Sequence, residues 1–280
     1  MARAIERIEQ DIAALEEAIR AIAIELQSAY ASYLNTLGLA VRKQLILASY
    51  HLCTQGYPEN FLHLSLNQRQ QLQQAIRKLG QLAAEQLLIY LKSEESGEDE
   101  GDEADEVDEE VTSSSSSLFF TSNSQYLTAN TSDPIELAKW QQKLEEAAQE
   151  ILKKLSHDAN LLLQKAGVLR KKLPEPILAA AAAASEASAE VMPGPPNLLN
   201  LVIEIENEQQ SEDSGLTQIM AINLRLGEIE FADVTLSSER KRIRSILVQL
   251  NKLGREYKKR YKEKAIAEAE AAWRASWFED

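Results

Sequence analysis

A stripe of apolar residues near the start of the chain constrains its fold more than any other feature. Its members alternate at steps of three and four residues: Ile5, Ile8, Ile12, Leu15, Ile19, Ile22, Leu26 and Ala29. This spacing places them all on one side of an α-helix, and its average of about 3.5 residues is the period of a supercoiled helix pair. Because such a stripe is unfavourable in water, it predicts that the helix packs against another helix, from this chain or from a second copy.

A second stripe with similar spacing lies towards the end of the chain and consists of Ile243, Ile246, Leu250, Leu253 and Tyr257. We call the two stripes the N-terminal seam and the C-terminal seam. They can pair with each other within one chain or across a dimer, and we expect self-association. The leading hypothesis for function is therefore a non-enzymatic coiled-coil scaffold or adaptor that mediates protein–protein association as a homo-oligomer, with the two seams as its contact surfaces.

The composition favours an all-α protein. Ala, Leu, Glu, Gln, Lys and Arg predominate, whereas the 280 residues include only 10 glycines and 7 prolines. These common residues are the stronger helix formers, and aromatic residues, which are frequent in strands, make up only 6%. We expect elongated helical hairpins or a coiled coil.

Residues 1–92 are predicted to form an N-terminal helical unit. Helices are expected at about residues 3–35 and 39–55, with Gly38 either separating them or lying in one bent rod. Gln55-Gly56-Tyr57-Pro58 is a stop signal, because glycine suits the position after a helix and proline cannot continue one. Ser65 with Gln68 forms a capping-box pattern that opens a third helix, ending near Leu91.

Residues 93–132 are predicted to be a disordered acidic and serine-rich linker. Twelve acidic residues and no basic ones lie between Glu94 and Glu110. The whole chain has 44 acids and 30 bases, so most of its net charge of −14 comes from this segment. Such a sequence buries too little apolar surface to offset the entropy of ordering it. A spacer is the favoured role, and regulation by phosphorylation is the alternative.

Three further segments complete the predicted organisation. Residues 133–192 form a helical rod with an alanine-rich end, opened by Asp133-Pro134; residues 193–197 form a Pro/Gly hinge; and residues 198–280 form a C-terminal helical unit. Within the last unit, residues 216–231 are ambiguous, because apolar residues there fit both helical spacing and a hairpin with its turn at Gly227. A helix is favoured, since a lone hairpin would be marginally stable.

The last long helix is strongly basic. Eleven bases lie between residues 240 and 264, opposed only by Glu256 and Glu263. The candidate polyanion-binding residues among them are Arg240, Arg244, Lys252, Arg255, Lys258, Lys259, Arg260 and Lys262. Nucleic-acid association, regulated by the acidic linker, is the alternative function, and contact with an anionic membrane is a weaker one. A solvated coiled-coil face, or ion pairs within the chain, is the favoured explanation.

Aromatic residues gather at the end of the same helix. Trp273, Trp277 and Phe278 are candidate docking aromatics, with two of them one helical turn apart. Packing inside this protein is the favoured interpretation, and an anchor for another protein is the alternative.

No motif points to catalysis, a cofactor or a metal. The sequence contains neither a nucleophile elbow, nor a phosphate-binding loop, nor a dinucleotide-binding glycine pattern. His51, Cys53 and His63 lie near one another, but residues two apart on a helix point to different sides, and there is a single cysteine. The first ten residues lack the apolar stretch of a signal peptide, and no apolar run reaches the length of a membrane span, so we expect a cytoplasmic protein.

Overall fold

The computed structural model describes residues 2–92, 132–169, 180, 195–205 and 215–277. In these residues the chain is nearly all-α, as its composition predicts. The longest helices are α1 (Ala2–His51), α3 (Leu66–Lys92), α4 (Pro134–Lys165) and α7 (Val234–Ser276). The predicted linker up to residue 131, most of the alanine-rich segment, the start of the Pro/Gly hinge and Phe278 lie outside the described residues.

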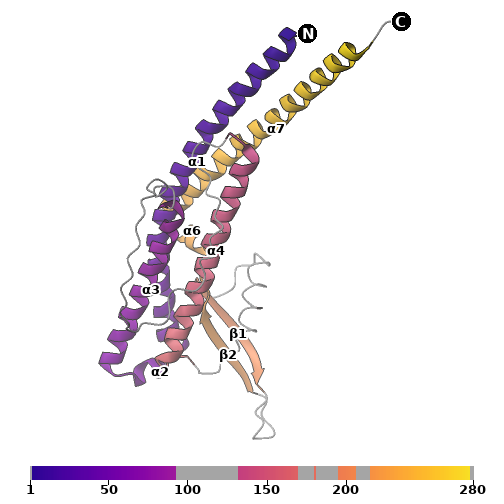
Figure 1. The fold of residues 1–280 in the computed structure, drawn as a ribbon. Coiled ribbons are helices and arrows are strands. Elements are labelled where there is room, and N and C mark those ends of the chain that lie inside the picture. The colour runs from indigo at the N-terminus through magenta and orange to yellow at the C-terminus, as the bar shows by residue number, and fades with distance from the viewer. Residues whose placement is uncertain (1, 93–131, 170–179, 181–194, 206–214, 278–280) are drawn as a thin grey trace, which may run out of the picture.

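The molecule is elongated, and α1 and α7 determine its length. Figure 1 shows these two helices running together beyond the others, so that both termini lie at the same end of the molecule. We call this projecting part, residues 2–18 of α1 and 255–276 of α7, the arm. The remaining elements form the body, in which α3 and α4 lie alongside α1 and α7.

Helix α1 continues through Gly38 as one rod. A side chain at position 38 would place its Cβ 3.0 Å from the Cβ of Ala84, so the glycine allows α1 and α3 to approach closely. The predicted stop is confirmed, because α1 passes into a single π-turn, η1 (Leu52–Gly56), and Pro58 opens the short helix α2 (Pro58–His63).

Both predicted helix starts at caps are confirmed. The Gln68 amide N–H donates to Ser65 Oγ at 3.3 Å, and the Ser65 N–H donates to Gln68 Oε1 at 2.9 Å. At α4, Ile135 N–H donates to Asp133 Oδ1 at 2.8 Å.

The favoured prediction of a helix over residues 216–231 is wrong in its first half. Strands β1 (Leu198–Ile205) and β2 (Gly215–Ile222) form an antiparallel hairpin with Leu198 opposite Ile222, and only α6 (Leu226–Ala232) is helical. The hairpin alternative with its turn at Gly227 is wrong as well, because Gly227 lies within α6.

Side chains from distant elements explain why this two-stranded hairpin forms. The Tyr57 hydroxyl accepts from Met220 N–H at 3.0 Å and donates to Met220 O at 3.2 Å. The Asn160 side chain of α4 makes the same two kinds of bond with Ile222 N–H and O, each at 2.9 Å. These contacts satisfy backbone groups on the open edge of β2, where an additional strand would otherwise bind.

One hydrophobic core connects the helices of the body. It includes Tyr30 and Tyr33 from α1, Leu87 from α3, Leu152 from α4 and Ile243 from α7, all essentially buried. The predicted N-terminal and C-terminal units therefore share a core, since α1 packs against both α3 and α7, and α3 packs against α4.

Candidate interaction surface on the C-terminal helix

The two predicted seams pack against each other within one chain. Ile12, Ile19, Ile22 and Leu26 of α1 are buried, as are Ile243, Ile246 and Leu250 of α7. The helices run in opposite directions, because Arg242 of α7 pairs with Glu25, whereas Lys264 pairs with Glu9 nearer the start of α1. Of the alternatives that the sequence leaves open, the structure shows pairing inside the chain.

The seams are buried less completely at the end of the arm than in the body, although Ile12 within the arm is buried. Ile5, Ile8 and Leu15 of α1 are only half-buried, and so are Leu253 and Tyr257 of α7. Opposite the first turns of α1, the antiparallel register brings the small residues Ala267 and Ala271 of α7. The apolar residues at the end of the arm are therefore covered less completely than those near the body.

Some bases of α7 serve to hold it against α1. Arg242 Nη2 lies 3.8 Å from Glu25, Arg260 Nη2 lies 3.5 Å from Asp11, and Lys264 Nζ lies 2.9 Å from Glu9. These pairs flank the seams and fix the register of the two helices. Because they are solvent-accessible, each contributes little to stability on its own.

Arg240 has a different environment, in a buried cluster that joins four helices. Its guanidinium pairs with both carboxylate oxygens of Glu145 on α4 and donates through Nε to Glu230 on α6 at 2.6 Å. It also donates through Nη2 to the Tyr33 hydroxyl at 2.6 Å and lies 4.4 Å from the centre of that ring. The Tyr33 hydroxyl donates to Glu230, and the Tyr30 hydroxyl donates to Glu145, each at 2.6 Å.

The ionisation of this cluster follows from its burial and pairing. Burial alone raises the pKa of Glu145, but the hydrogen bonds from Arg240 and Tyr30 outweigh it and hold that pKa below its ordinary value. Burial likewise opposes the charge of Arg240, and the bonds to Glu145 outweigh it, so its pKa is raised. Burial raises the pKa values of Tyr30 and Tyr33 well above their usual range. The cluster is thus an internal network in which one guanidinium joins two carboxyl groups and a tyrosine hydroxyl.

This environment removes Arg240 from the candidate polyanion-binding residues. Its side chain is 12% exposed and already engages two carboxylates, so it cannot reach an external polyanion without breaking the core. Arg260 is also engaged, with Asp11 and Glu263. The remaining candidates, including Lys258, are exposed.

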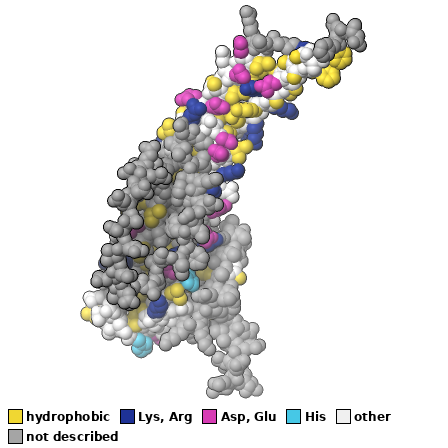
Figure 2. Space-filling view, viewed as in Figure 1, with side chains coloured by type: hydrophobic (Ala, Val, Ile, Leu, Met, Phe, Trp, Pro, Cys, Tyr) yellow, Lys and Arg dark blue, Asp and Glu magenta, His cyan; other side chains and the backbone are white. Residues whose placement is uncertain are grey.

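The exposed bases form a line on the face of α7 opposite its seam. Six of them are spaced so that, with Val248, they recur every three or four residues: Lys241, Arg244, Lys252, Arg255, Lys259 and Lys262. We call these six residues the outer stripe. None of them forms an ion pair with another described residue. In Figure 2, dark-blue side chains follow one edge of the arm. Lys241 belongs to the stripe although the sequence candidates omit it, and its helical spacing is the signal that identifies it.

The two tryptophans lie at the end of the same face. Trp273 and Trp277 are 66% and 65% exposed, and their ring centres are 5.8 Å apart. The described residues therefore leave both indoles largely open to solvent, in contrast to the favoured expectation of internal packing. Ile266, which is 50% exposed, lies between them and the outer stripe. Hydrophobic side chains are visible at the tip of the arm in Figure 2.

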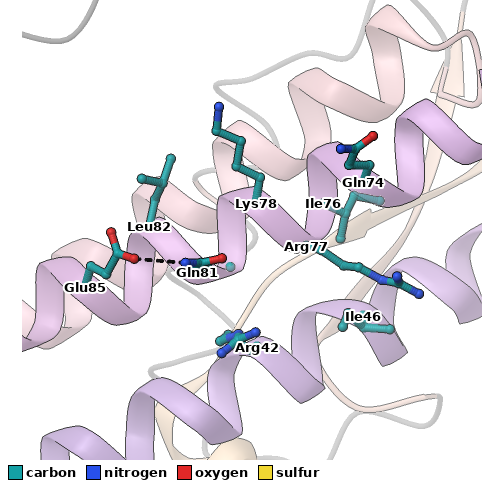
Figure 3. A pocket seen from close by; sticks show the side chains of 10 residues that line it. Arg42, Ile46, Gln74, Ile76, Arg77, Lys78, Gln81, Leu82 and Glu85 are labelled. Atoms are coloured by element: carbon teal, nitrogen blue, oxygen red, sulfur yellow. Dashed lines mark hydrogen bonds between the residues drawn. The ribbon is translucent and has the colours of Figure 1, made fainter.

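A separate groove of about 750 Å³ lies between α1 and α3. Figure 3 shows Arg42 and Ile46 of α1 across from Arg77 and Gln81 of α3, whereas Lys78 points away from α1. Gln81 donates to Glu85 at 3.1 Å along its wall. The lining mixes cationic, acidic and aliphatic groups along an open helix–helix junction, and it brings no nucleophile and base together.

The histidine and cysteine residues do not converge. Cys53 is buried, which raises the pKa of its thiol to about 11, and His63 is exposed on α2. Among the described residues, no three His, Cys, Asp or Glu side chains are arranged to hold a metal ion.

Comparison of the chain with protein-family models, with curated proteins and with solved structures finds no match. In the part of the chain that the structure describes, no helix combines the length and the apolar character needed to cross a bilayer.

Proposed function

We propose that the chain is a non-enzymatic scaffold that associates with a second copy of itself through the end of the arm. The observation that supports this proposal most strongly is the incomplete burial of Ile5 and Ile8, where the N-terminal seam continues but α7 offers mainly small side chains. The proposal also places the protein in the cytoplasm, as the sequence suggests.

A pair of helices and a four-helix bundle differ in how completely they enclose their apolar residues. In a two-helix arm, each seam is covered from one side only, whereas a four-helix bundle encloses its apolar residues. Two arms lying side by side would cover each other's half-buried residues with the same surface, which is the self-complementary contact of a twofold dimer. The start of α1 and the end of α7 lie at the same end of the molecule, so a second arm could approach there without meeting the body (Figure 1).

Light scattering coupled to gel filtration tests the proposal. We expect twice the chain mass of 31.3 kDa for the wild type and the single chain mass for the double variant Ile5→Ser/Ile8→Ser. Residues nearer the body are unsuitable for this purpose, since Ile12 and Ile19 belong to the buried seam and their replacement would damage the fold.

The matched control is Ile24→Ser, which changes an α1 isoleucine that is already 59% exposed. It should keep the dimer mass, and circular dichroism should show unchanged helix content in all variants. A wild type with the mass of one chain, or a dimer that survives the double substitution, would contradict the proposal.

A further inference from the structure

The residues of the outer stripe are exposed and form no ion pair that holds α7 against another described element. Within the described part of the chain, Arg240, Arg242, Arg260 and Lys264 of α7 form ion pairs with carboxylates of other elements. The six stripe residues point away from α1 and have no such partner among the described residues. Closely spaced like charges on one helix face repel each other, so the stripe slightly disfavours the isolated helix. This repulsion suggests that the outer stripe binds an anionic partner outside the chain.

The outer stripe and the apolar residues that follow it lie along one face of α7. From Lys241 to Trp273 the helix rises by about 48 Å at 1.5 Å per residue. The spacing of three or four residues continues from Lys262 to Ile266, and steps of seven and four residues lead on to Trp273 and Trp277. A single flat surface could therefore contact the bases and the exposed apolar residues at the same time.

The apolar end of the outer face favours a lipid surface over nucleic acid. Phosphate groups of either kind would attract the bases, whose span from Lys241 to Lys262 is about 32 Å and fits within one helical repeat of a duplex of about 34 Å, so the length of the stripe does not separate the two. Phosphate contacts along a duplex, however, leave Ile266, Trp273 and Trp277 without a partner. Tryptophan partitions favourably into the headgroup region of a bilayer, and neighbouring lysines and arginines bind anionic headgroups there.

We propose that the outer face of α7 binds the surface of an anionic lipid bilayer. The outer stripe contacts the phosphate and carboxylate groups of the lipids, while Ile266 and the two indoles enter the interface at the tip of the arm. Binding is peripheral and reversible, because it relies on a few apolar side chains and on charges that salt screens. The inference is independent of self-association, since the outer stripe lies opposite the seam.

Co-sedimentation with vesicles tests the inference directly. The full chain is mixed with vesicles of phosphatidylcholine and phosphatidylserine, or of phosphatidylcholine alone. We expect binding to the anionic vesicles only, reversed by salt, with a shift of tryptophan emission to shorter wavelength. Trp140 packs against Tyr30 in the body and supplies a constant background.

Two variants separate the contributions of charge and of the aromatic end. Lys252→Gln/Lys259→Gln/Lys262→Gln should weaken binding by roughly 100-fold, at about one kcal/mol for each charge near the surface. Trp273→Ser/Trp277→Ser should weaken it by about tenfold and abolish the emission shift. All five residues are exposed, so helix content and melting temperature should stay unchanged.

The matched control removes the same charge from α4 through Lys139→Gln/Lys143→Gln/Lys154→Gln, all at exposed positions. It should bind vesicles like the wild type. Equal binding to both kinds of vesicle, or equal weakening by the control, would overturn the inference. Binding to a nucleic-acid duplex in the same buffer without binding to anionic vesicles would overturn it as well and assign the stripe to nucleic acid.

Discussion

Arg240 and Lys241 are neighbours with the same charge, yet they belong to two different regions of the molecule. Arg240 faces the body, where its side chain is 12% exposed and contacts Glu145, Glu230 and Tyr33. Lys241 faces solvent and begins the outer stripe. A rotation of about 100° along the helix separates the two environments. The face of the helix on which a base lies, rather than its charge, therefore decides whether it serves the fold or an external surface.

The same contrast extends to the body and the arm as a whole. In the body, apolar and charged side chains of α7 are enclosed by α1, α4 and α6, so a change there alters stability. In the arm, α7 has α1 as its helical neighbour, and its outer face can be changed without disturbing a core. Stability and binding should therefore respond to different substitutions.

The largest effect on stability is expected for Arg240→Met. Removing the guanidinium leaves Glu145 and Glu230 buried without their cationic partner, which should lower the free energy of unfolding by about 3–5 kcal/mol. Urea denaturation measures this loss. The neighbouring change Lys241→Met should alter it by less than about 0.5 kcal/mol, and similar losses for both variants would contradict the distinction between the two faces.

Replacing a buried and an exposed isoleucine of α1 should show a comparable contrast in stability. Ile19 is fully buried, so Ile19→Ala should cost about 2–4 kcal/mol through lost contacts and a cavity. Ile24→Ala, five residues further on, changes an exposed side chain and should be nearly neutral. Denaturation curves of the two variants give the comparison, and equal midpoints would show that the seams do not pair within the chain.

A smaller effect is expected where α4 supports the hairpin. Asn160→Ala removes both hydrogen bonds to Ile222 and should destabilise the protein by about 1–3 kcal/mol. Amide hydrogen exchange should become faster at Ile222 first, because its N–H loses its acceptor. Unchanged exchange at that residue would mean that the side chain does not hold the edge of β2.

The pH dependence of stability should reveal the Arg240 cluster. The folded-state pKa of Glu145 lies below its ordinary value of 4.5. The ionised carboxylate therefore makes its full contribution to the free energy of unfolding above pH 4.5, and this contribution is lost as the pH falls through the folded-state pKa. In Arg240→Met, burial favours the protonated form instead. The stability difference between wild type and variant should therefore narrow below pH 4.5 in denaturation measured at stepped pH, and a constant difference would contradict this explanation.

The smallest effect on stability is expected for the outer stripe. Lys252→Gln, Lys259→Gln and Lys262→Gln should each change the free energy of unfolding by no more than about 0.5 kcal/mol, since the three side chains are exposed. Thermal melts of the single variants test this expectation. A clear loss of stability would mean that the stripe serves the fold and is not reserved for a partner.

Local patterns in the sequence predict much of the fold. The spacing of Ile5 to Ala29 and of Ile243 to Tyr257 predicts two helices with seams, and the patterns at Ser65 and Asp133 predict where helices begin. These features depend on residues only a few positions apart. The hairpin could not be predicted in this way, because Tyr57 and Asn160, which stabilise its edge, lie far from it in the sequence.

The candidate surface is only partly predictable for a related reason. Counting bases between residues 240 and 264 detects a cationic helix but not which bases face the carboxylates of other elements. Arg240 is among the candidates chosen from the sequence, but its side chain lies inside the body. Lys241 is not among those candidates, but its side chain lies on the exposed outer face. The partners that make this difference, Glu145 and Glu230, are 95 and 10 residues away from Arg240.

Protection of individual lysines from acetylation, measured by mass spectrometry with and without anionic vesicles, tests most directly whether α7 has one face for the fold and another for binding. We expect protection of Lys241, Lys252, Lys259 and Lys262, with no change at Lys139, Lys143 and Lys154 of α4. Equal protection on both helices, or none on the outer stripe, would contradict this expectation.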